Sequence, residues 1–196
     1  TGNQILNFGG GAATNPAAGI RTLAQYGINV RYNTVNNNNG SGVNHATTLR
    51  GIYLNTATSA NATISNNTVV LQSGATTSAA TAIDNQSGST AASNTITISN
   101  NTVSGAYSTS TTGVWTGIQN GSSAATVNID GNTMTGFNLA GTGTCVMIET
   151  GSPTTATASN NSITSITRSG ASGSWRIIKT TSPTNFTANG NTIDGL

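Results

Sequence analysis

Apolar and polar residues alternate along several short segments of this chain, and each segment ends in the same polar signal. Aliphatic residues occupy every second position, a bend residue and an Asn follow, and then come Thr or Ser and another aliphatic residue. Alternation with period 2 predicts a β-strand with one buried face. The pattern lies at residues 28–35, 62–69, 96–103, 127–134, 156–163 and 186–193, and in truncated form at 2–5.

The Asn that follows the bend recurs every 29 to 34 residues, and an isoleucine follows it 16 to 19 residues later. We call each such series of recurring positions a column. Two columns with a nearly constant offset along the whole chain identify a structural repeat. The Asn column is Asn3, Asn33, Asn67, Asn101, Asn132, Asn161 and Asn191. The isoleucine column is Ile20, Ile52, Ile83, Ile118, Ile148 and Ile178.

Each repeat is expected to form one turn of a coil. The residue before the column Asn is Gly or Asn, except at Tyr32. Gly and Asn tolerate a positive φ, so this position predicts a sharp bend. One strand precedes the bend, a second follows it, and a third carries the isoleucine. Stacked turns would pair these strands in parallel and bury their aliphatic side chains on one another.

The run Asn-Asn-Thr followed by Val or Ile resembles the repeat of the right-handed parallel β-helix, the solenoid of pectate lyases, phage tailspikes and bacterial surface proteins. The resemblance covers the chain from about Gly2 to Leu196. It implies a single all-β solenoid over residues 1–196, with about six coils of roughly 30 residues. The Asn- and Thr-rich style is most similar to repeat segments of large secreted bacterial surface proteins of the adhesin or filament type. This similarity implies an extracellular or cell-surface location.

The Asn column is predicted to be a structural ladder rather than a metal or substrate site. Its side chains would stack about 4.8 Å apart inside the coil. A side-chain amide carries both donors and an acceptor, so such a column can hydrogen-bond along the axis and satisfy the carbonyl groups of the bends. The ladder residues are Asn33, Asn67, Asn101, Asn132, Asn161 and Asn191, with Asn3 in the truncated first copy.

An outward column of hydroxyl groups runs beside the ladder. A flat array of Thr side chains could order water, and ice binding is therefore a third functional hypothesis. However, the positions two residues after the column do not form a second column of hydroxyl groups, because their residue types vary. The preference of Thr for exposed strands also explains the first column without ice binding. The column is Thr34, Thr68, Thr102, Thr133, Ser162 and Thr192.

Composition narrows the possible partners. Thr, Asn, Gly and Ser supply 110 of the 196 residues, whereas only 10 residues are charged and the net charge is +2. Nucleic-acid binding needs clustered Lys and Arg, so we expect no nucleic-acid partner. No apolar run approaches the roughly 18 residues of a membrane helix, so we expect no membrane insertion. The single cysteine, Cys145, excludes an internal disulfide and is expected to be a small buried hydrophobe.

The acidic residues do not form a predicted catalytic cluster, and we expect no enzyme, metal or cofactor. Asp84 and Glu149 share an outward column but lie two turns apart, about 10 Å, which is too far for a retaining glycosidase pair. Glu149 and Lys179 lie in adjacent turns of that column and are expected to form an exposed ion pair. His45 is expected to be a solvated loop residue.

Two tryptophans are the candidate ligand-binding residues. Trp115 and Trp175 each precede a column isoleucine by three residues and lie two turns apart, with Cys145 between them. Their spacing of about 10 Å suits a disaccharide. Glycan contact through these two residues is one interpretation, and packing of both indoles in the interior or under a loop is the other.

The main hypothesis is a non-catalytic, extracellular β-helical segment that serves as a stalk or adhesive shaft. The runner-up is a carbohydrate-binding or carbohydrate-active β-helix that uses Trp115 and Trp175. The chain starts and stops within the repeat, at Gly2 and Leu196, with no terminal cap signal. We therefore expect a fragment or a subunit of a longer assembly, with adjacent β-helical segments or further copies of the chain as partners.

Overall fold

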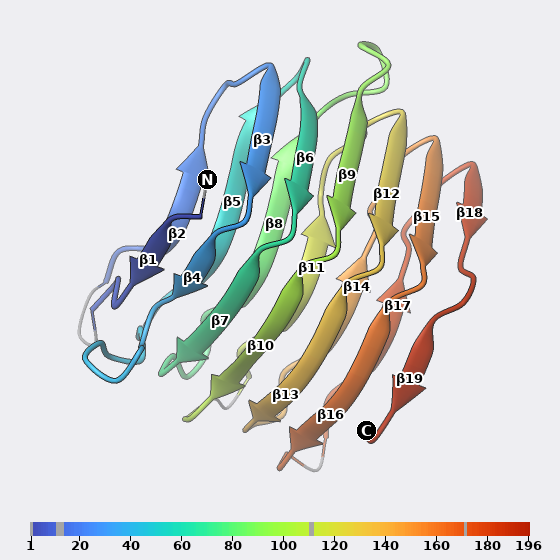
Figure 1. Cartoon of the computed structure of the whole chain (residues 1–196). Helices are drawn as coiled ribbons and strands as arrows, with labels where there is room; N and C mark the ends of the chain where they lie inside the picture. The colour runs from blue at the N-terminus through green and yellow to red at the C-terminus, as the bar shows by residue number, and fades with distance from the viewer. Residues whose placement is uncertain (1, 11–13, 110–111, 171) are drawn as a thin grey trace.

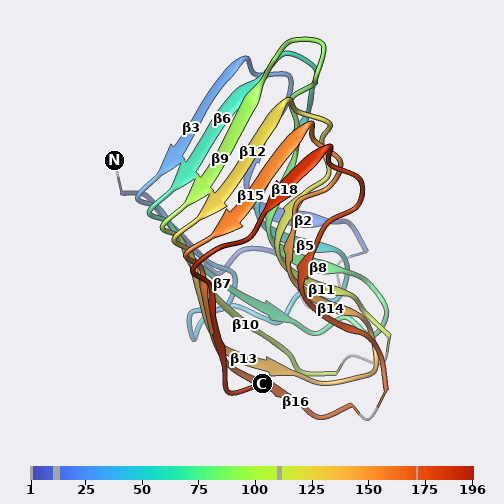
Figure 2. The ribbon, with the colours of Figure 1, turned by 90° about the vertical axis from the view of Figure 1, so that its right-hand side faces the viewer.

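The protein is an all-β coil of parallel strands in the computed structural model, which describes residues 2–10, 14–109, 112–170 and 172–196. In Figure 1 the coil advances from left to right. The strands nearer the viewer run downward and the strands behind them run upward, so the coil is right-handed (Figures 1 and 2). About six turns of roughly 31 residues are stacked. The predicted parallel β-helix is confirmed.

Three sheets enclose the interior when the molecule is viewed along its axis (Figure 2). Sheet A contains β1 (Gln4–Leu6), β4 (Thr34–Asn36), β7 (Thr68–Ser73), β10 (Thr102–Tyr107), β13 (Thr133–Leu139), β16 (Ser162–Arg168) and β19 (Thr192–Asp194). Sheet B contains β2 (Ala17–Thr22), β5 (Leu49–Ala57), β8 (Ala80–Ser87), β11 (Trp115–Asn120), β14 (Cys145–Glu149) and β17 (Trp175–Lys179). Sheet C contains β3 (Gly27–Arg31), β6 (Asn61–Ser65), β9 (Thr95–Ser99), β12 (Thr126–Asp130), β15 (Thr155–Ser159) and β18 (Asn185–Thr187).

The bend between sheets C and A is made by one residue in the left-handed region of each coil. Its φ lies between 54° and 71° at Gly2, Tyr32, Asn66, Asn100, Gly131, Asn160 and Gly190. Six of these seven residues are Gly or Asn, which adopt this conformation most easily. Tyr32 adopts it too, so the bend is imposed at this position by the stacked coils and not by residue type alone.

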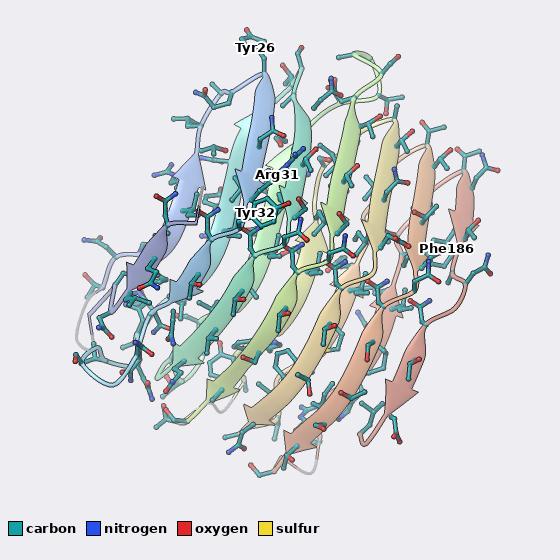
Figure 3. The ribbon with its side chains drawn as sticks, viewed as in Figure 1. Tyr26, Arg31, Tyr32 and Phe186 are labelled. Atoms are coloured by element: carbon teal, nitrogen blue, oxygen red, sulfur yellow. The ribbon has the colours of Figure 1, made fainter. Side chains whose placement is uncertain are left out.

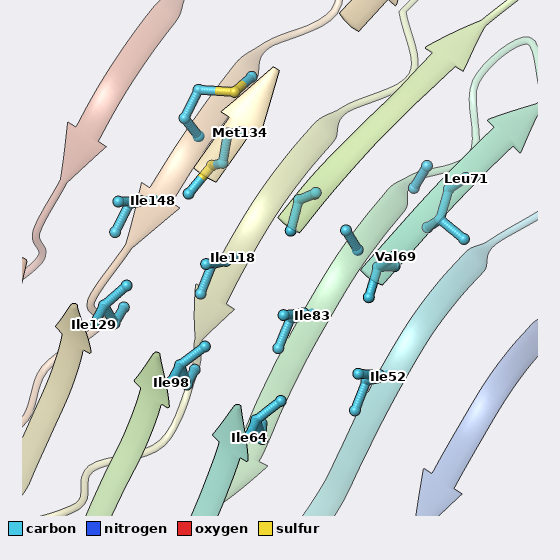
Figure 4. Packing of buried hydrophobic residues seen from close by; sticks show 14 of the residues in the cluster. Ile52, Ile64, Val69, Leu71, Ile83, Ile98, Ile118, Ile129, Met134 and Ile148 are labelled. Carbon is cyan, nitrogen blue, oxygen red and sulfur yellow. The ribbon is translucent and has the colours of Figure 1, made fainter. Parts of the chain in front are cut away.

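The core consists of aliphatic columns that run along the axis. In sheet B each column isoleucine lies directly opposite the next, from Ile20 to Ile178. Figure 4 shows Ile52, Ile83, Ile118 and Ile148 of this column packed beside aliphatic residues of the other sheets. Burial of apolar surface between coils stabilises each turn on its neighbours.

The asparagine ladder is present and continuous from Asn3 to Asn191. In a middle rung, the backbone N of Asn67 donates to Asn101 Oδ1 at 3.0 Å, and Asn67 Nδ2 donates to the same oxygen at 2.9 Å. Asn67 Nδ2 also donates to the carbonyl of Val30 in the preceding coil at 2.9 Å. One buried amide therefore ties three successive coils together, as the sequence predicted.

No helix long and apolar enough to cross a membrane occurs in the part of the chain that the structure describes.

Candidate functional site

The charged residues gather on the outer face of sheet B. Two outward columns on this face hold six of the ten charged residues of the chain. The first column is Ala18, Arg50, Thr81, Thr116, Val146 and Arg176, and the second is Arg21, Tyr53, Asp84, Gln119, Glu149 and Lys179. The second column has the register that the sequence predicted.

Arg50 and Asp84 form a salt bridge that the sequence did not reveal. Arg50 Nε donates to Asp84 Oδ2 at 2.7 Å, and Gln86 Nε2 donates to Asp84 Oδ1 at 2.6 Å. Both oxygens of this buried carboxylate are therefore engaged. Arg50 lies one coil before Asp84 and three residues earlier in the strand alignment, so simple column matching does not pair them.

The other carboxylate on this face is also paired. Glu149 and Lys179 form the predicted ion pair, with Lys179 Nζ donating to Glu149 Oε1, but the pair is partly buried rather than exposed. Gln119 lies opposite Asp84 on one side and Glu149 on the other. The two carboxylates are thus two coils apart and do not share one pocket.

A pocket of about 390 Å³ opens on this face at the first two coils. The Arg50 guanidinium lies over the Tyr53 ring at 4.3 Å from its centroid, and that of Arg21 lies 5.9 Å from the same centroid. Cation–π contact of this kind favours both arginines beside the ring. Arg21 is exposed, whereas Tyr53 is half-buried. The lining residues are Pro16, Ala17, Ala18, Arg21, Arg50 and Tyr53.

The predicted tryptophan pair does not form a glycan platform, because Trp115 lies in the core. Its side chain is 1% exposed and packs edge-to-face against Tyr107 and Phe137, with ring centroids 5.9 and 5.7 Å away. Nε1 of Trp115 has no hydrogen-bond partner among the described residues. The interior-packing interpretation therefore holds for Trp115, and an inward indole cannot stack on an external sugar.

Trp175 occupies the same column in the last coil and is 37% exposed. The Arg168 guanidinium lies 5.6 Å from its ring centroid. Cys145, directly opposite it in the preceding coil, is buried. Trp175 is thus an inward residue that no following coil covers in the described structure.

His45 is not a solvated loop residue. It is 1% exposed, and its Nδ1 lies 3.2 Å from the backbone N and 3.0 Å from the carbonyl oxygen of Gly10. Its Nε2 lies 2.9 Å from Thr47 Oγ1. The ring therefore joins the loops of two adjacent coils, a structural role that neighbours in sequence do not disclose.

Cys145 is buried, as predicted. Burial raises the pKa of its thiol to about 12, and the nearby Arg168 charge lowers it by a smaller amount. Only a thiolate is an effective nucleophile, so both the raised pKa and the burial disfavour reaction at this thiol. Burial likewise raises the pKa of Tyr107, beside Trp115, to about 12, against a smaller lowering by its hydrogen bond with Ser73.

A second, shorter ladder was missed from the sequence. Asn85 and Asn120 are fully buried at the end of sheet B, and Asn85 Nδ2 donates to Asn120 Oδ1 at 2.7 Å. Asn120 Nδ2 continues to the carbonyl of Thr150 in the next coil at 3.0 Å. The signal was available, because both residues follow a column isoleucine by two positions and precede a serine by two.

Short polar side chains cover the outer faces of sheets A and C (Figure 3). The hydroxyl column of sheet A keeps its register from Thr34 to Thr192. The positions two residues after this column do not form a continuous second column, because the β10–β13 register shifts between Val103 and Gly105. Arg31 and Tyr32 lie at the N-terminal end of the face shown in Figure 3, and Phe186 at the opposite end.

No group of three or more His, Cys, Asp or Glu side chains that could hold a metal is found among the residues that the structure describes. No protein-family model matches the chain, and no curated protein or solved structure is significantly similar to it. Any functional argument therefore depends on the coil and its surfaces.

Proposed function

We propose that this chain is a non-catalytic structural and adhesive segment of an extracellular bacterial surface protein or filament. The observation that carries the proposal is the direction of the asparagine ladder. In each inner rung the donors belong to one coil and the accepting Oδ1 to the next. Such a ladder has an acceptor end and a donor end, so coils can extend it only head to tail.

The donor end lies at Asn191, whose Nδ2 donates to the carbonyl of Ala158 in the preceding coil. Among the described residues, no further Oδ1 accepts from Asn191, and no side-chain donor reaches Oδ1 of Asn3. A second copy placed with its Asn3 end on Asn191 would form one further rung, in which the donors of Asn191 meet Oδ1 of Asn3. It would also pair the edges of β17, β18 and β19, which otherwise offer unpaired backbone groups.

The apolar columns support the same partner. Phe186 is 39% exposed and Ile193 is 47% exposed, although they belong to columns that point inward. Their neighbours in the preceding coil, Ala156 and Ile163, are fully buried. A further coil would cover Phe186 and Ile193 as each inner coil covers the one before it. The occupant would be an adjacent β-helical segment or a second copy of this chain, and association of the purified chain tests the second.

The surface fits a shaft better than a catalyst. The carboxylates of Asp84 and Glu149 are each engaged by a cation and lie two coils apart. Hydroxyl and amide groups dominate the rest of the exposed faces, and they offer weak polar contacts to surfaces or glycans. A stiff coil with such faces would serve as an extended, weakly adhesive shaft and would catalyse no reaction.

The test is the mass of the purified chain in solution, measured by light scattering over a wide concentration range. We expect mass to rise with concentration, and electron microscopy to show rods that lengthen along the coil axis. Phe186→Lys places a charge on the C-terminal end of the coil and should leave a monomer. Thr97→Lys, on the outer face of the inner strand β9, is the matched control and should associate like the parent. A monomer at every concentration contradicts end-to-end association.

A further inference from the structure

The pocket on sheet B is cationic, a property that a purely structural shaft does not require. Arg21 and Arg50 bring two guanidinium groups to one Tyr53 ring, in a chain with six basic residues in all. Asp84, the only carboxylate paired with either of them among the described residues, is buried beneath the face. The accessible side of the pocket is therefore cationic.

The Arg50 guanidinium is held in place and retains donors. Its Nε donates to Asp84, and its Cζ lies 4.3 Å from the centroid of the Tyr53 ring. Tyr53 is itself fixed, because its hydroxyl donates to Asn55 Oδ1 at 2.8 Å. A guanidinium has five N–H donors, so four remain on its terminal nitrogens after the bond from Nε. A preorganised fork of this kind matches a carboxylate better than a mobile lysine does.

Part of the pocket lining is apolar. Pro16, Ala17 and Ala18 line the pocket beside the two arginines. A volume of about 390 Å³ lies within the size range of small-ligand sites, roughly 300–1,000 Å³, and suits a molecule with one or two rings. The combination of a cationic end and an apolar wall requires a ligand with an anionic group attached to a compact body.

We propose that this pocket binds a small organic carboxylate that carries a ring, with the carboxylate on Arg21 and Arg50 and the ring against Pro16, Ala17 and Ala18. Acidic sugars and aromatic acids share this chemistry. The site does not require end-to-end stacking, since its residues lie at β2 and β5 of one chain, but β2 is also the edge strand of sheet B that a stacked copy would contact. Binding would give the shaft a specific contact in addition to its general polar surface.

The experiment is a titration of the ¹⁵N-labelled chain at low salt, followed by NMR. Glucuronate and benzoate are the carboxylate probes, and glucose and benzyl alcohol are their neutral counterparts. We expect one or both carboxylates to shift resonances of β2 and β5, and the neutral compounds to leave them unchanged. A response to glucuronate alone identifies an acidic-sugar site, and a response to benzoate alone identifies an aromatic-acid site.

Arg21→Ala is the decisive variant, because Arg21 is exposed and makes no salt bridge among the described residues. It should weaken carboxylate binding at least tenfold, about 1.4 kcal/mol. Arg21→Gln, which keeps most of the side-chain stem, should behave alike. Arg176→Ala is the matched control: it removes the same charge from the same sheet, five coils away from Arg21, and should bind like the parent.

Three results would overturn the proposal. The first is the absence of any shift in β2 and β5 with either carboxylate. The second is equal weakening by Arg21→Ala and Arg176→Ala, which would mean that only the net charge of the chain matters. The third is binding of inorganic phosphate as tight as that of the carboxylates, because a site for any anion would not need the apolar wall.

Discussion

Single buried amides hold the coils in register at the residue scale. Asn101 is fully buried, and its Oδ1 accepts from both the backbone N and Nδ2 of Asn67. Its own Nδ2 donates to the carbonyl of Ile64 and to Asn132 Oδ1, each at 3.0 Å. A buried polar group without a partner costs about 1–3 kcal/mol, so the ladder penalises any slip of one coil against the next.

We predict that Asn101→Ala lowers the free energy of unfolding by about 2–4 kcal/mol, because it leaves the backbone N of Asn67 and the carbonyl of Ile64 without their side-chain partners. Urea denaturation followed by circular dichroism measures the change. Asn138→Ala, at an exposed position of β13, is the matched control and should stay within about 0.5 kcal/mol of the parent. Equal losses in the two variants would show that the ladder has no special role.

At the scale of single strands, departures from regular geometry determine which side chains point into the core. In sheet B the paired positions pass over the residue before each column isoleucine, such as Gly117 in β11. Strict alternation would put Trp115 and Ile118 on opposite faces, since they are three residues apart. Both side chains lie in the core instead. The irregularity at Gly117 is what turns Trp115 inward.

The facing strand β10 makes room for this indole with a glycine. A Cβ at Gly105 would lie 2.6 Å from the carbonyl oxygen of Leu71 and 2.7 Å from Trp115 Cζ2. The Leu71 oxygen belongs to the backbone of the preceding coil and cannot move away alone. Gly105 is therefore required by the close approach of β7, β10 and Trp115.

We predict that Gly105→Ala destabilises the protein by about 1–3 kcal/mol through overpacking and displaces Trp115. Thermal unfolding gives the stability, and a change in Trp fluorescence reports the displacement. The control is Gly27→Ala in β3, where an added Cβ meets no atom within 4 Å and should change stability by less than about 0.5 kcal/mol. Unchanged stability and fluorescence in Gly105→Ala would contradict this account of the core.

Stability should vary along the axis at the scale of the whole molecule. Inner coils are paired on both sides, whereas β17, β18 and β19 each have one neighbour in their sheets. The strands β18 and β19 are also exposed along their whole length. A solenoid is stabilised mainly by contacts between adjacent repeats, so a coil with one neighbour opens more easily than one with two.

We expect amide hydrogen exchange to reveal this gradient in dilute, monomeric samples. Protection should be highest in β8, β9 and β10 and lowest in β18 and β19. Raising the concentration until chains associate should add protection to both terminal coils, β1–β3 and β17–β19, because head-to-tail stacking pairs the first coil of one chain with the last coil of another. Uniform protection along the coil, or protection of inner strands only, would contradict the predicted gradient and its response to stacking.

Sequence periodicity alone predicts the repeat, the number of coils, the bends and the asparagine ladder. These features depend on periodicity, and residues about 31 positions apart meet in a solenoid wherever the repeat keeps its phase. Asn67 and Asn101 could therefore be paired without coordinates. The register of the Arg21 column and the Glu149–Lys179 ion pair followed from the same rule.

Features that depart from the period could be assigned only from the folded coil. Trp115 points inward because its strand is irregular at Gly117, and His45 is buried at a contact with Gly10, in the loop of the preceding coil. The Arg50–Asp84 bridge joins two different columns, which column matching does not consider. Periodicity specifies which residues are stacked, but the direction of each side chain depends on the local path of the backbone, and that path is set by packing of the assembled coils.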